Sequence, residues 1–109
     1  MPVPNFDHFL ADLRNDVVAF AEDQWKEVKN QAVADGNAFL EGIKADLQNW
    51  TNDVAAGKLS QDEVKWLVAG KKDLVALQGL KLAGLAQARR DQFVNGLIAV
   101  VANAIAKAV

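Results

Sequence analysis

The residues that could carry catalysis are few and are not grouped. His8 is the only histidine, and it falls near Asp7 and Asp12 at the expected start of a helix. A lone histidine at a helix start is typical of a solvated residue, because a general base or metal ligand needs further groups at a defined spacing. The Glu-x-x-His spacing of a helical di-iron site does not occur. The sequence therefore predicts no metal site and no histidine-based catalysis.

Nucleophiles and phosphate-binding motifs give the same expectation. Ser60 is explained by helix capping, and Thr51 has no neighbouring base. Acidic pairs such as Asp12 and Asp16 have the i,i+4 spacing of a solvated helix face. The chain has no cysteine, and its seven glycines form no phosphate-binding loop. We expect a protein that is not an enzyme, with no cofactor and no small-molecule substrate.

The first half of the chain carries an apolar stripe with a period of eleven residues. Eleven residues make three turns of about 3.67 residues each, so such a stripe stays nearly straight along a helix. This pattern, and the absence of strand-like alternation, predicts an all-α protein. Its members are Phe6, Val17, Val28, Phe39 and Trp50, and one turn later Leu10, Ala21, Ala32, Ile43 and Val54.

Residues 57–60 carry agreeing signals for a tight turn. Gly57 suits the position after a helix end, and Ser60 with Glu63 forms a capping box at the next helix start. We therefore expect a single helical domain over 1–109, with a helix at about 6–56, a turn at 57–60 and a helix at about 61–108. Two helices of about 70 Å each at 1.5 Å per residue would form a long antiparallel hairpin.

The triplet Asp35-Gly36-Asn37 leaves a second architecture open. Such triplets often form turns, although the apolar stripe crosses this one without losing phase. The alternative to the hairpin is a compact monomeric four-helix bundle, broken near Gly36.

If the second half is one helix, it is apolar on two sides. One stripe runs from Val64 to Ala104, and a two-helix hairpin would bury only one side. The other side then needs a partner, since large apolar patches are rarely left in water. We expect a homo-oligomer in which hairpins dimerise into a four-helix bundle. The predicted interface residues are Trp66, Leu77, Leu80, Ile98, Ile105 and Val109.

The two halves differ in charge. Residues 1–57 carry ten acids against four bases, and residues 58–109 carry eight bases against four acids. Opposite signs favour contact between the halves, and the dispersed bases are a poor nucleic-acid footprint, so we expect no nucleic-acid partner. A hairpin turning near residue 58 would place Lys71 near Asp46 and Arg89 near Glu27.

Residues 92–106 contain no charge, which allows a second hypothesis for function. Gly96 in this stretch would allow another helix to approach closely. Fifteen residues are short for a membrane span, which needs about twenty. With no signal peptide pattern at the start, we expect a cytoplasmic protein. We expect a structural or protein-interaction module that self-associates; the alternative is an amphipathic membrane-active or lipid-binding protein. The stripe is similar in period to the helices of apolipoproteins and synucleins, without their Lys-Thr-Lys-Glu-Gly-Val consensus.

Overall fold

The computed structural model describes residues 6–75 and 77–108, and within them every regular element is helical. The all-α prediction is confirmed. The α-helices are α1 (Phe6–Gln24), α2 (Lys29–Gly42), α3 (Lys44–Ala55), α4 (Gln61–Ala69), α5 (Gln78–Leu82) and α6 (Gln87–Ala108). Two short 3₁₀ helices, η1 (Lys26–Val28) and η2 (Lys72–Leu74), lie between them.

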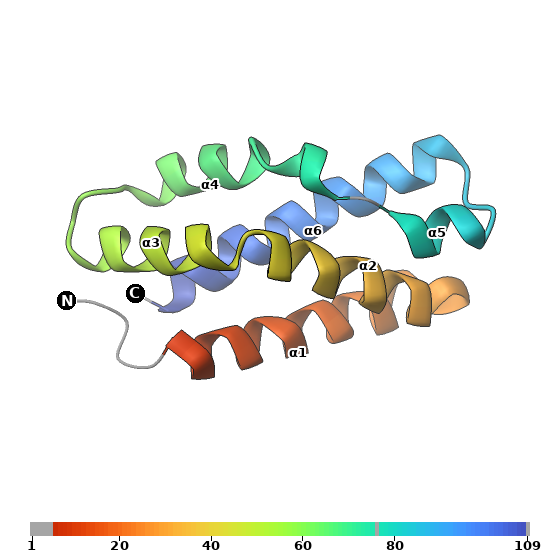
Figure 1. Ribbon diagram of the computed structural model, residues 1–109, viewed down its shortest axis with the longest axis horizontal. Helices are drawn as coiled ribbons and strands as arrows, with labels where there is room; N and C mark the ends of the chain where they lie inside the picture. The colour runs from red at the N-terminus through yellow and green to blue at the C-terminus, as the bar shows by residue number, and fades with distance from the viewer. Residues whose placement is uncertain (1–5, 76, 109) are drawn as a thin grey trace.

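The chain runs back and forth along the long axis of a molecule that measures 43 × 23 × 20 Å (Figure 1). α1 runs in one direction, and α2 with α3 returns beside it. α4 and α5 then run outward again, and α6 returns to the end where α1 begins. As a result α6 packs against both α1 and α4, so the first and last helices share one core.

The predicted continuous helix over 6–56 is wrong, because the chain reverses at Trp25. Trp25 leaves the helical region, with φ −132° and ψ 40°, and its side chain is buried. The indole makes edge-on contacts with Phe20 and Phe93, with ring centroids 6.3 and 5.5 Å away. These contacts with α1 and α6 hold the break, although no glycine, proline or capping residue marks it in the sequence.

Gly36 is not a break, so the alternative prediction also placed the turn wrongly. It lies inside α2, and a Cβ added there would come within 2.6 Å of Val17 Cγ1 on α1. The missing side chain lets α2 pack closely on α1. A smaller interruption occurs at Ile43, which separates α2 from α3 with φ −114° and ψ 15°.

The predicted turn at 57–60 is present. Gly57 adopts φ +78°, a conformation that glycine reaches without steric cost. The Glu63 amide donates to Ser60 Oγ, and the Ser60 amide donates to Glu63 Oε1, each at 3.1 Å. This complete capping box starts α4 directly after the turn.

The predicted continuous helix over 61–108 is wrong as well. α4 ends at Ala69, and α6 begins only at Gln87. Between them, Leu77 has the left-handed φ of 54° and Gly84 has φ +78°, so the chain bends on both sides of α5. Neither long helix of the predicted hairpin is therefore continuous.

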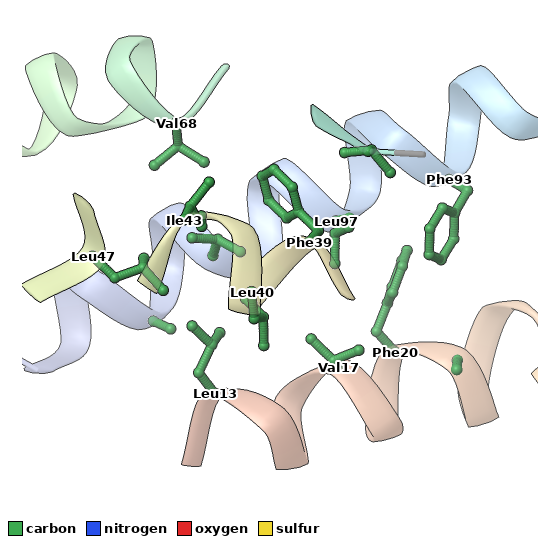
Figure 2. Packing of buried hydrophobic residues seen from close by; sticks show 14 of the residues in the cluster. Leu13, Val17, Phe20, Phe39, Leu40, Ile43, Leu47, Val68, Phe93 and Leu97 are labelled. Carbon is green, nitrogen blue, oxygen red and sulfur yellow. The ribbon is translucent and has the colours of Figure 1, made fainter. Parts of the chain in front are cut away.

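The core contains most of the eleven-residue stripe together with residues from the second half. Figure 2 shows Leu13 and Val17 of α1 facing Leu40 of α2, with Leu97 of α6 and Val68 of α4 closing the cluster. The Phe20 and Phe93 rings lie 5.6 Å apart at one end. The uncharged stretch 92–106 lies within α6, which supplies Phe93, Leu97 and Val101 to this core.

Candidate interaction surface

The predicted interface residues do not share one surface. Trp66 is 77% exposed on α4, whereas Leu77 and Ile98 are only partly exposed. Leu80 and Ile105 are buried within the chain's own core, so they cannot belong to an association surface in this conformation. Val109 lies outside the described residues.

Ile105 is buried because α6 packs against both α1 and α4, whereas the misplacement of Leu80 comes from the break in the second half. The two-sided apolar pattern assumed a single helical phase from 61 to 108, but the bends around α5 reset that phase. Leu80 consequently turns toward the core, while Leu82, two residues later, is 89% exposed. Trp66 is exposed because α4 keeps its phase from the capping box onward, and its place at an interface stays a prediction.

Trp66 borders a shallow apolar groove on the outer side of α4. The groove has a volume of about 510 Å³ and is lined by Trp66, Leu67, Ala69, Gly70, Lys71 and Lys72. Trp66 and Leu82 are the two strongly exposed large apolar side chains in the described part of the chain, and Leu82 is not among the groove residues. Large aromatic side chains dominate the energetics of protein interfaces, so an exposed indole beside an apolar groove can bind another surface.

Lysines give the rim of this groove a positive character. Lys65 is exposed next to Trp66 in the sequence, and Lys71 and Lys72 line the groove itself. Lys71 Nζ lies 3.3 Å from Asp46 Oδ2 on α3, which ties the end of the groove to the first half of the chain. The Lys71–Asp46 ion pair therefore fixes one wall of the groove. Lys72 lies on its exposed rim.

Both charge pairs predicted between the halves are present. In addition to the Lys71–Asp46 pair, Arg89 Nη2 lies 3.6 Å from Glu27 Oε2. The Arg89 guanidinium also lies over the Trp25 ring, 4.5 Å from its centroid. Arg89 thus links the start of α6 to the reversal between α1 and α2 by an ion pair and a cation–π contact.

The side chains that could carry out catalysis either stabilise helices or are largely exposed. The Thr51 hydroxyl is buried and donates to the carbonyls of Leu47 and Gln48, at 2.9 and 3.0 Å. His8 Nε2 lies 3.8 Å from Asp12 Oδ2, and both side chains are largely exposed. Within residues 6–75 and 77–108, no group of three or more His, Cys, Asp or Glu side chains could hold a metal ion.

One polar residue that the sequence reasoning misread is Asp35. It is only 7% exposed, and its two carboxylate oxygens accept from the amides of Gly79 and Leu80, each at 2.9 Å. The Asp35-Gly36-Asn37 triplet suggested a local turn, but the carboxylate instead caps a helix that begins more than forty residues later. A signal was present, because Asp35 shares the helical spacing of the stripe residues Ala32 and Phe39, but its partner could not be identified from the sequence.

Comparison with known proteins does not indicate a function for this chain. The chain matches no protein-family model, no curated protein and no solved structure. None of the helices in the described part of the chain combines the length and the apolar character that crossing a membrane requires.

Proposed function

We propose that this protein is a non-enzymatic helical interaction module that self-associates through the outer face of α4. The observation that carries the proposal is Trp66, an indole 77% exposed beside an apolar groove of about 510 Å³. We further propose that one copy forms an antiparallel helix bundle by itself. Association would then join two folded copies, rather than complete a core between two hairpins.

The arrangement around Trp66 suits a two-fold contact. In a two-fold dimer the same patch is used by both copies, so the patch must be complementary to itself. A projecting indole and a groove on one face meet this condition, because each indole can enter the groove of the other copy. Gly70 and Ala69 leave the groove open, while Lys72 lies at its edge. Burial of two indoles would supply the apolar centre that stable interfaces have.

The test is the solution mass, measured by sedimentation equilibrium without detergent. Trp66→Lys should shift the protein to monomer, because it removes the indole and places a charge beside Lys71 and Lys72. Leu82→Lys is the matched control, since Leu82 is also strongly exposed and lies outside the groove. The control should keep the wild-type mass. A monomeric wild type, or loss of association in both variants, would contradict the proposal.

A second function is favoured by the lysines near Trp66. An indole flanked by lysine suits the headgroup region of an anionic membrane, as in the lipid-binding hypothesis. In that case the wild type should float with vesicles containing phosphatidylserine and not with vesicles of phosphatidylcholine alone. Trp66→Lys should reduce flotation through loss of the indole, although it adds a positive charge. No flotation with either vesicle would rule out this second function.

A further inference from the structure

α5 is attached to the rest of the molecule mainly by its packing on α2. It is five residues long, and the side chain of Leu80 is the one that it buries. Leu82, two residues later, is 89% exposed. Helices this short have little stability of their own, so their position depends on tertiary contacts. α5 packs against α2, so its position depends on the contacts with α2 (Figure 1).

The contact with α2 consists of a buried carboxylate and a close backbone approach. Asp35 accepts from the Gly79 and Leu80 amides, which are otherwise unpaired groups at the start of α5. A Cβ at Gly79 would lie 3.1 Å from both Asp35 Oδ1 and the Gln31 carbonyl oxygen. A side chain at this position would therefore crowd the carboxylate and the backbone of α2.

The surroundings of α5 favour its release. Leu77 precedes it with a left-handed φ of 54°, a conformation that is sterically strained for a residue with a side chain. Gly84 follows it with φ +78°. On the side of α6, a groove of about 520 Å³ is lined by Val75 and Leu77 together with Val94 and Asn95. α5 is therefore held from the α2 side, and the groove beside α6 reaches the segment at Leu77, where it begins.

We propose that residues 77–85 form a latch, held closed by Asp35, that opens as a unit while α1–α4 and α6 stay folded. Opening uncovers Leu80 and the part of α2 on which it packs. Segments with few buried contacts commonly open independently of global unfolding. A partner that binds the uncovered surface would shift the population toward the open form. The latch does not depend on association through Trp66.

Hydrogen exchange followed residue by residue with NMR tests the latch. Asp35→Asn keeps the shape of the side chain and removes its charge, so opening should become about tenfold or more frequent. The critical amides are those of Ala83, Gly84 and Leu85, which donate to the carbonyls of Gly79, Lys81 and Leu80 inside the segment. They should exchange faster by the same factor as Gly79 and Leu80, because a released segment this short does not stay helical and loses these bonds in the same opening event.

Two further variants make the result decisive. Gly79→Ala should give the same exchange pattern without changing charge, because its methyl group would press on Gln31 and Asp35. Asp23→Asn, at an exposed acid near the end of α1, should leave the exchange of residues 77–85 unchanged. The latch would be overturned by faster exchange at Gly79 and Leu80 alone, or by equal acceleration in α1 and α6, which would indicate global unfolding.

Discussion

At the scale of single residues, the close contacts in this molecule depend on missing side chains. Gly96 of α6 faces the Phe20 ring, and an added Cβ would lie 2.6 Å from Cζ and 2.8 Å from Cε1. The sequence predicted close helix approach at Gly96, and this contact confirms it. At Gly36 the sequence suggested a turn instead. The residue type is the same at both positions, so only the surrounding helices distinguish a packing glycine from a turn glycine.

The same substitution at two glycines should therefore have opposite effects on stability. Gly96→Ala should lower the free energy of unfolding by about 1–3 kcal/mol, because the methyl group displaces a packed aromatic ring. Gly42→Ala should raise it by up to about 1 kcal/mol, since nothing lies within 4 Å of the added Cβ and alanine favours the helix. Urea unfolding monitored by circular dichroism measures both. Equal effects of the two substitutions would show that the Phe20 contact is not tight.

At the scale of elements, the end of a helix could be predicted from the sequence only where residues close to it in the chain determine it. The turn before α4 was predicted because Gly57, Ser60 and Glu63 act on neighbouring backbone groups. The reversal at Trp25 was missed because its cause is contact with Phe93, which lies far away in the sequence. The left-handed Leu77 was missed for the same reason, since it is stabilised by the docking of α5 and not by its own preference.

The capping box gives the element-scale prediction. Ser60→Ala should lower the free energy of unfolding by about 1 kcal/mol, because the Glu63 amide loses its acceptor. Ser60→Asp retains an acceptor at the same position and should stay close to the wild type. Thermal unfolding of the three proteins in parallel checks the order. If Ser60→Asp were as destabilised as Ser60→Ala, side-chain capping would not explain the turn.

At the scale of the whole molecule, the periodic pattern identified buried faces but not the number of helices. The eleven-residue stripe keeps its phase across Trp25, and residues such as Val17, Val28 and Phe39 on both sides of the reversal are buried. A periodic pattern is equally consistent with one long helix and with two shorter ones. The charge pairs between the halves were nevertheless predicted correctly. Each half reverses at the same end of the molecule, which brings Glu27 and Arg89 together (Figure 1).

This difference in architecture can be measured by small-angle X-ray scattering. The radius of gyration of the Cα atoms is 13.7 Å, and a compact chain of this length is expected at about 13 Å. A hairpin about 70 Å long would instead give a radius of about 20 Å. Trp66→Lys should therefore scatter as a compact particle with a radius of gyration of about 14–15 Å at all concentrations, allowing for its hydration. The wild type should start from that value in dilute solution and increase with concentration as copies associate. A variant that scatters at 20 Å when fully monomeric would contradict the reversals at Trp25 and around α5, whereas a concentration-independent wild type would contradict only the association through Trp66.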